Sequence, residues 1–127
     1  MIRILLAEDD RILRKAGEVS LKKKGYDVVS AVDGEDALTK ALAHTPDLIL
    51  LDVMMPKMNG FDVLFALKRD PAVKDIPVIM LTNLEQPADI QRAVDGGAHS
   101  YLVKSNMNLD DLAAKIRNAL TDRVRPA

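Results

Sequence analysis

Two short runs of this chain, residues 48–51 and 78–81, are apolar at every position. A strand that is apolar on both faces has to be covered by helices on both sides, as central strands of parallel sheets are. Further short β-rich runs alternate with stretches of helical period along the whole sequence. The predicted strands are residues 2–7, 27–31, 48–52, 77–82 and 100–103. This alternation predicts a chain of β–α units.

The stretches between these runs have the apolar spacing of amphipathic helices, and each apolar stripe is expected to face the sheet. The first helix is predicted to begin near Arg11, the fourth to cover residues 87–94, and Asp36 and Asn108 to cap the second and fifth helices. The predicted stripes are Ile12, Leu13, Ala16 and Val19 in the first helix; Ala37, Leu38, Ala41 and Leu42 in the second; Phe61, Leu64 and Phe65 in the third; and Leu109, Leu112, Ala113, Ile116, Ala119 and Leu120 in the fifth.

Five β–α units joined by right-handed crossovers form a doubly wound α/β sheet. We predict a five-stranded parallel sheet of flavodoxin-like order 2-1-3-4-5, with helices on both faces. A length of 127 residues indicates one domain. We expect that domain to cover residues 1–120 and residues 121–127 to form a short tail.

The charge balance and the absence of cysteine exclude several functions. Lys and Arg number 18 against 19 Asp and Glu, which gives a net charge of −1. Binding to nucleic acid or to an acidic membrane surface needs a basic excess, so we expect neither. With no cysteine, thiol catalysis and thiolate zinc sites are excluded, and a reducing, cytoplasmic location is expected.

Acidic residues follow two strands that are predicted to be neighbours. Glu8, Asp9 and Asp10 follow the first strand, and Asp52 ends the third. In such sheets ligands bind beyond the carboxyl ends of the strands, where the strand order reverses. Two carboxylates about 4 Å apart repel by roughly 4 kcal/mol at an effective dielectric of about 20, so the cluster should recruit a cation, raise a pKa, or both. Oxygen ligands alone favour Mg²⁺ or Mn²⁺ over zinc.

The other predicted strands contribute two more polar residues to the same rim. Thr82 ends the fourth strand, and Lys104 follows the fifth. Because Lys104 stands at the end of an apolar strand, we expect it to belong to the site. Asp10 is better explained as the N-cap of the helix that begins near Arg11.

Four segments of the chain resemble the receiver domain of two-component response regulators. They are residues 4–10, 48–60, 78–82 and 98–104, with the sequences ILLAEDD, LILLDVMMPKMNG, VIMLT and AHSYLVK. The motifs occur in family order, and the resemblance covers essentially the whole chain. It implies that Asp52 accepts a phosphoryl group from a sensor histidine kinase or a phosphotransfer protein. It also implies a signalling domain rather than an enzyme, with a phosphorylation-dependent surface for a downstream protein that the sequence does not name.

The resemblance further implies a metal site. Mg²⁺, or Mn²⁺ in its place, would be bound by Asp9, Asp52 and the backbone carbonyl of Met54, with Glu8 holding a metal-bound water. This fits the chemistry, because phosphoryl transfer depends mostly on positioning and charge neutralisation.

Three residues are implied to act on the phosphoryl group or to respond to it. Thr82 and Lys104 would contact the phosphoryl group. Tyr101 would be the switch aromatic, which moves inward when Thr82 is drawn to that group. From the sequence alone, Tyr101 is equally well explained as an ordinary edge-strand aromatic. The implied output face combines the fourth helix, the fifth strand and the fifth helix.

The chain departs from the family pattern at two positions. Ser105 follows Lys104 where the family usually has proline after a cis peptide bond, and a cis bond before a non-proline residue costs roughly 3 kcal/mol. The sequence therefore leaves open whether the Lys104–Ser105 bond is cis, as the family pattern implies, or trans. Asn83 replaces the small residue that is common after the threonine, and we hypothesise that it narrows access to the phosphoryl group and changes its lifetime.

Three other functions are compatible with a fold of this type. An aspartate-nucleophile phosphatase needs an acid–base aspartate where Met54 stands. A flavin-binding protein needs a Ser-, Thr- or Gly-rich phosphate loop where the acidic residues 8–10 stand. A receiver-like module that works without phosphorylation is the remaining rival. We expect a stand-alone receiver that is a monomer or a phosphorylation-dependent dimer.

Overall fold

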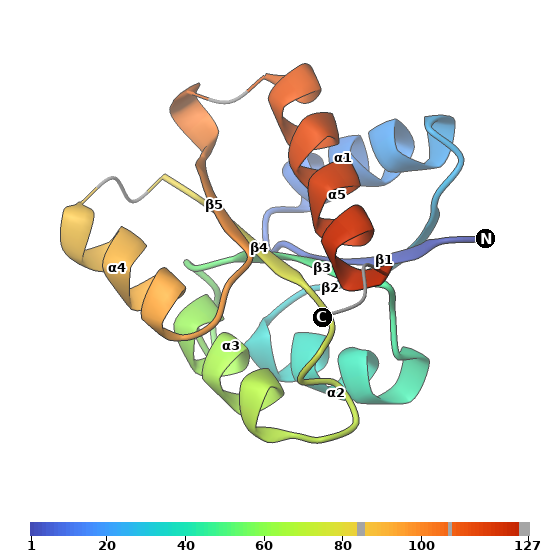
Figure 1. Ribbon diagram of the computed structural model, residues 1–127. Helices are drawn as coiled ribbons and strands as arrows, with labels where there is room; N and C mark the ends of the chain where they lie inside the picture. Colours follow the sequence, from blue (N-terminus) through green and yellow to red (C-terminus); the bar gives the residue numbers. More distant parts are fainter. Residues whose placement is uncertain (84–85, 107, 125–127) are drawn as a thin grey trace.

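The computed structural model describes residues 1–83, 86–106 and 108–124. Five parallel strands form one sheet in the order β2-β1-β3-β4-β5 (Figure 1), which confirms the predicted fold class and strand order. The strands are β1 Arg3–Ala7, β2 Asp27–Ala31, β3 Leu48–Asp52, β4 Val78–Thr82 and β5 Ser100–Val103. The helices are α1 Arg11–Lys23, α2 Gly34–His44, α3 Gly60–Arg69, α4 Pro87–Asp95 and α5 Leu109–Val124, and a 3₁₀ turn, η1 Lys104–Asn106, follows β5.

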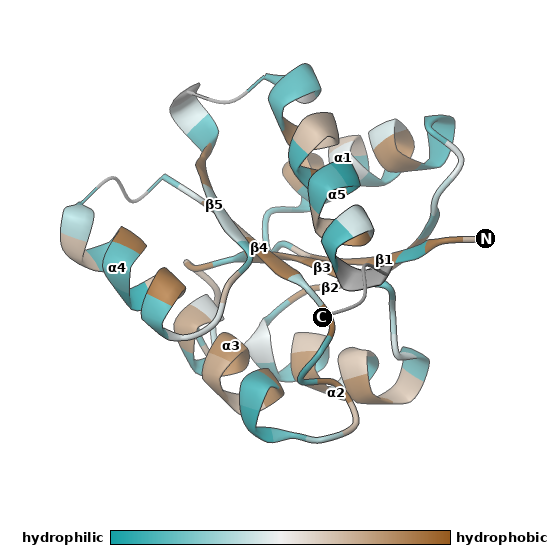
Figure 2. Cartoon of the chain, viewed as in Figure 1, coloured by the Kyte–Doolittle hydropathy of each residue, from teal (hydrophilic) through white to brown (hydrophobic). Residues whose placement is uncertain are grey.

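The sheet separates two hydrophobic cores. Ile4 and Leu6 of β1 enter the core that α1 and α5 cover, whereas Leu5 and Ala7 enter the core that α2, α3 and α4 cover. This alternation follows from the two-residue period of a strand. Every residue of β3 and β4 is buried, and the middle of β4 is brown in Figure 2. The continuous apolar runs are thus explained by helices on both faces.

The element boundaries differ slightly from the predicted ones. β1 and β4 begin at Arg3 and Val78, one residue later than predicted. Pro77 still contributes its carbonyl to the ladder, because Ile49 N donates to it at 3.0 Å. α5 continues to Val124, into the segment predicted as a tail. Residues 125–127 of that tail and the side chain of Leu109 lie outside the described parts of the chain.

The predicted orientation of α1 is wrong. Ile12 and Val19 are 80% and 44% exposed, and Leu13 and Ala16 are exposed as well. The residues that face the sheet are Gly17, which lies against Leu6, and the buried Leu21. The apolar stripe of α1 therefore points to solvent.

The predicted cap of α2 is also wrong. Asp33, not Asp36, is the N-cap, and its Oδ1 accepts from the backbone N of Asp36 at 2.8 Å. Asp36 Oδ2 in turn accepts from Val32 N at 3.0 Å, which is a reciprocal arrangement of the capping-box type. Leu42 of the predicted α2 stripe is 41% exposed. The caps of α1 and α5 are confirmed, since Asp10 and Asn108 accept from backbone N–H groups of those helices.

Candidate functional site

The site lies at the carboxyl ends of four adjacent strands. Glu8 and Asp9 follow β1, Asp52 ends β3, Thr82 ends β4, and Lys104 follows β5. Because β3 lies between β1 and β4, residues that are far apart in the sequence meet at this edge of the sheet. The structure thus brings together the acidic residues and the lysine that the sequence placed on one rim.

Three carboxylates form a compact cluster. Glu8, Asp9 and Asp52 each offer one carboxylate oxygen, and these oxygens all lie within 4.8 Å of one another. Glu8 and Asp52 are buried, whereas Asp9 is exposed. Like charges at this separation repel strongly when water is partly excluded. The donor set is therefore suited to a hard divalent cation.

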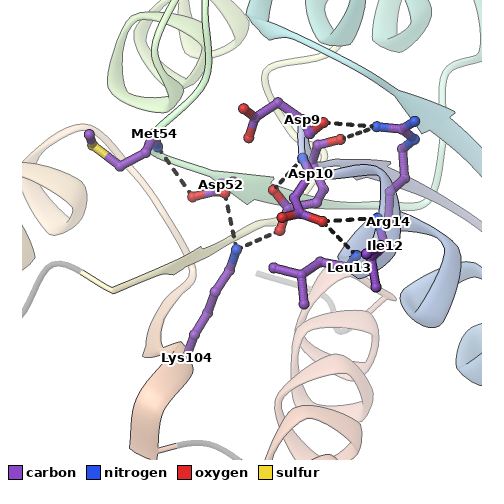
Figure 3. A network of polar contacts seen from close by, with 9 residues as sticks. Asp9, Asp10, Ile12, Leu13, Arg14, Asp52, Met54 and Lys104 are labelled. Atoms are coloured by element: carbon purple, nitrogen blue, oxygen red, sulfur yellow. Dashed lines mark hydrogen bonds and ion pairs between the residues drawn. The ribbon is translucent and has the colours of Figure 1, made fainter.

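Lys104 binds two of these carboxylates (Figure 3). Its Nζ lies 2.5 Å from Glu8 Oε1 and 3.0 Å from Asp52 Oδ2. The lysine comes from η1, so β5 and the turn after it direct the ammonium group across β4 to the cluster. One positive charge is thereby shared by two buried negative charges, which leaves the cluster with a net negative charge.

Burial and the charges of this cluster shift the pKa values of Glu8 and Lys104. Burial is the main reason that the pKa of Glu8 is raised, and the neighbouring Asp52 raises it further although Lys104 opposes the shift. Burial, the largest single influence, would lower the pKa of Lys104, but its hydrogen bonds to Glu8 and Asp52 and the negative charges of these two residues together outweigh burial, so this pKa is raised. The ammonium form of Lys104 is thus favoured at neutral pH.

The loop after β3 is fitted tightly to the end of that strand. Met54 N donates to Asp52 Oδ1 at 3.2 Å, while the Met54 side chain is exposed. Lys57 has a left-handed backbone with φ 68°. A Cβ added to Gly60 would lie 2.3 Å from the carbonyl oxygen of Asp52, so only glycine fits there. The loop therefore keeps one carboxylate oxygen of Asp52 oriented.

The loop after β1 is held from the side of α1. Asp10 Oδ1 accepts from Ile12 N at 2.9 Å and from Leu13 N at 3.0 Å, which confirms that Asp10 is a cap. Arg14 Nη1 donates to the backbone carbonyls of Glu8 at 2.9 Å and Asp9 at 3.2 Å. Sequence reasoning missed Arg14, because an arginine that binds backbone carbonyls leaves no pattern in side-chain types.

Thr82, Asn83 and Tyr101 have different exposures. Thr82 is fully buried at the end of β4, and Asn83 next to it is exposed. Tyr101 of β5 is half-buried and packs against the core on the α4 side. Burial raises the pKa of the Tyr101 phenol, and the charge of Asp89 on α4 adds to that shift. No peptide bond in the described segments is cis, so the bond between Lys104 and Ser105, which the sequence left open, is trans.

The fold and the residues at the strand ends define a class of protein. A family model described as the response regulator receiver domain matches residues 4–117. The chain belongs to this family, whose members are two-component signalling domains that bind Mg²⁺ through acidic residues.

Curated relatives and solved structures agree with this family. The chain is 44% identical over 115 residues to the gliding motility regulatory protein of Myxococcus xanthus, a match that covers 91% of this chain and 15% of that protein. It is 42% identical over 129 residues to the DNA-binding dual master transcriptional regulator RpaA of Synechocystis, and here the match covers 100% of this chain and 53% of that protein. The chain thus spans only part of the length of these relatives.

Among solved structures, chemotaxis protein CheY4 of Vibrio cholerae matches with a TM-score of 0.87 and 33% identity, over 94% of this chain and 98% of that one. The signal receiver domain of a histidine kinase from Syntrophus aciditrophicus matches with a TM-score of 0.90 and 31% identity, over 100% and 96% of the two chains. None of the helices in the described parts of the chain is long and apolar enough to cross a membrane.

Proposed function

We propose that this chain accepts a phosphoryl group on Asp52 from a sensor histidine kinase or a phosphotransfer protein. The observation that carries the proposal is the meeting of Asp52 with Glu8, Asp9 and Lys104 at one edge of the sheet. An Asp52 carboxylate oxygen attacks phosphorus, a P–O bond forms, and the P–N bond to the donor imidazole breaks. The imidazole keeps the electron pair of the broken P–N bond and leaves as a neutral ring when its other nitrogen carries a proton; a ring without that proton takes one from solvent.

The acidic cluster suits Mg²⁺ because its ligands are carboxylates alone. Asp9, Asp52 and the Met54 carbonyl would hold the ion, and Glu8 would hold a water bound to it. When bound, Mg²⁺ supplies positive charge that neutralises the phosphoryl oxygens. Mn²⁺ has the same preference for oxygen ligands and could replace it.

The residues beside Asp52 would then orient the phosphoryl group. Lys104, which already lies 3.0 Å from Asp52 Oδ2, supplies a second positive charge. Thr82, at the end of the adjacent strand β4, would donate a hydrogen bond from its hydroxyl group to a phosphoryl oxygen. A phosphoryl group adds about −1.5 to −2 charges, which can shift the protein between two states only by binding one of them better.

The half-buried Tyr101 would carry that shift to the surface formed by α4, β5 and α5, where a downstream protein would bind. This signalling does not require turnover of an external metabolite. Size-exclusion chromatography before and after phosphorylation would decide between a monomer and a phosphorylation-dependent dimer.

The phosphodonor has to cover the rim of this site, and the exposed stripe of α1 begins beside it. Ile12 and Leu13 lie two and three residues after the Asp10 cap, in the first turn of α1, and both are exposed. We propose that the donor packs against this stripe, since large exposed apolar side chains next to a transfer site mark an interaction surface. An Ile12→Asp variant should be labelled by phosphoramidate as fast as the parent chain, but more slowly by a phosphorylated histidine protein that labels the parent.

The central test is intact-mass measurement after incubation with phosphoramidate or acetyl phosphate and Mg²⁺. One added phosphoryl group is expected in the parent chain and in the control variant Asp62→Asn, which changes an exposed carboxylate of α3. Asp52→Asn and EDTA should abolish the gain. A folded parent chain that gains no mass would overturn the proposal and favour a receiver-like module that works without phosphorylation.

A further inference from the structure

Arg14 contacts the acidic loop from the side opposite the phosphoacceptor. In Figure 3 the segment after β1 lies between the Arg14 guanidinium and Asp52. Arg14 Nη1 donates to the carbonyl oxygens of Glu8 and Asp9, at 2.9 and 3.2 Å. One guanidinium thus binds the carbonyls of two consecutive residues, and the side chains of both residues belong to the carboxylate cluster.

The backbone of this loop is fixed at each residue. Glu8 N donates to the carbonyl of Ala31 in β2 at 3.1 Å, and the carbonyl of Glu8 accepts from Arg14. The Asp10 side chain is bound to the first turn of α1. The carbonyl of Asp9 lies between these points, and its side-chain partner is Arg14. Without Arg14, the peptide unit between Asp9 and Asp10 loses that partner.

The cluster itself does not hold Asp9 in place. Lys104 forms ion pairs with Glu8 and Asp52, but Asp9 makes no ion pair with any residue in the described ranges. The Asp9 carboxylate is exposed and lies within 4.8 Å of two other carboxylates. Repulsion from these groups therefore drives it outward into water. Something other than charge has to keep it beside Asp52.

We propose that Arg14 is a positioning residue that presets Asp9 and Glu8 for a divalent cation. This inference rests on the proposed function, because it assumes that the cluster binds Mg²⁺. By fixing the two carbonyls, Arg14 keeps the side chains of Glu8 and Asp9 oriented toward Asp52 before the ion binds. The ion then loses less binding free energy to the ordering of its ligands. Removing groups that orient metal ligands typically weakens metal binding by about 10- to 100-fold.

The sign of the effect separates positioning from simple charge. Arg14 is a cation near a cation site, so a purely electrostatic role predicts that its removal strengthens Mg²⁺ binding. A positioning role predicts the opposite. Arg11 offers a matched control, because it is an exposed arginine of the same helix turn for which no contact with the loop carbonyls is seen.

The test is calorimetric titration of the full chain with Mg²⁺, without any phosphodonor. Arg14→Gln should weaken binding at least about tenfold, and Arg14→Lys should weaken it less, because a flexible ammonium keeps the charge but lacks the planar fork. Arg11→Gln should bind within about twofold of the parent chain, since a surface charge change is screened by salt.

Several outcomes would overturn the inference. Mg²⁺ binding by Arg14→Gln that equals or exceeds that of the parent chain would do so, while leaving the proposed function intact. If circular dichroism shows that Arg14→Gln is unfolded, Arg14→Lys decides the question: unchanged binding by this charge-preserving variant rules out positioning. A parent chain that binds no Mg²⁺ would overturn the proposed metal site and this inference together.

Discussion

α1 and α5 cover the same face of the sheet, yet they use their apolar residues in opposite ways. α5 buries Ala113, Ile116 and Ala119 in the core beneath it, as its spacing predicts. α1 leaves Ile12 and Val19 exposed and turns Gly17 and Leu21 inward. The two helices show that an apolar stripe marks a face of a helix without saying which neighbour covers it.

The difference has a physical cause in what lies beneath each helix. α5 lies over an apolar part of the sheet, so its apolar stripe is best placed inward. α1 begins at the acidic site and runs beside edge strand β2, where polar groups need partners. Arg14 binds two loop carbonyls, and Glu18 Oε1 accepts from Ser30 Oγ of β2 at 2.8 Å. With these polar contacts turned inward, the apolar stripe of α1 lies on the solvent-facing side of the helix.

The largest expected contrast is between two isoleucines. Ile116 of α5 is 1% exposed and Ile12 of α1 is 80% exposed. Ile116→Ala should lower the free energy of unfolding by about 2–5 kcal/mol, because it leaves a cavity. Ile12→Ala should change it by no more than about 0.5 kcal/mol. Urea denaturation measures both, and equal losses would mean that α1 faces the sheet as first predicted.

A smaller effect should come from filling the contact between α1 and β1. A Cβ at Gly17 would lie 2.8 Å from Leu6 Cδ2, so Gly17→Val should destabilise the fold by about 1–3 kcal/mol through overpacking. Ala16→Val, on the exposed side, should cost only the helix-propensity difference of about 0.5 kcal/mol. If Gly17→Val matched Ala16→Val in thermal unfolding, the close approach of α1 to the sheet would be disproved.

The hydrogen bond between Glu18 and Ser30 should contribute less still. A double-mutant cycle with Glu18→Ala and Ser30→Ala should give a coupling of about 0.5–1.5 kcal/mol, the usual net value of such a bond. The cycle cancels the helix-propensity effect of the alanine at position 18. If the losses of unfolding free energy in the two single variants add up to the loss in the double variant, this bond does not help to set the rotation of α1.

The smallest effect should be a pH dependence of the unfolding free energy that comes from the ion pair between Arg3 of β1 and Asp27 of β2. A hydrogen bond from Arg3 lowers the pKa of Asp27 below its ordinary value of 3.8, and both side chains are partly exposed. A depressed folded-state pKa stabilises the fold above about pH 3.8, and this stabilisation is lost as the pH falls through the folded-state pKa. The difference in unfolding free energy between the parent chain and Asp27→Asn should therefore shrink below pH 4 and at high salt. A difference that is constant down to pH 2 would contradict the shift.

The sequence was sufficient for the parts of the site that depend on topology. Parallel strands end at the same edge of a sheet, so the sequence alone places Glu8, Asp9 and Asp52 together, with Lys104 on the same rim. The bridging of Glu8 and Asp52 by Lys104 could not be foreseen, because it depends on where η1 aims the side chain.

Other features were beyond the reach of residue patterns. Asp33 and Asp36 are both good caps by type, and only the path of the backbone decides between them. The inward side of α1 makes hydrogen bonds to loop carbonyls and to an edge strand, which apolar periodicity does not register. The metal, phosphoryl and switch roles remain predictions for the experiments above.

The contact between Gly60 and the backbone of Asp52 has a practical consequence for engineering. Gly60, the downstream anchor of the loop, lies against the backbone of Asp52, the residue proposed to accept the phosphoryl group. A loop transplanted from another receiver would need to retain glycine at this anchor, even if every solvent-facing residue between Val53 and Asn59 were exchanged. Any bulkier anchor would shift the aspartate before a donor protein could reach it.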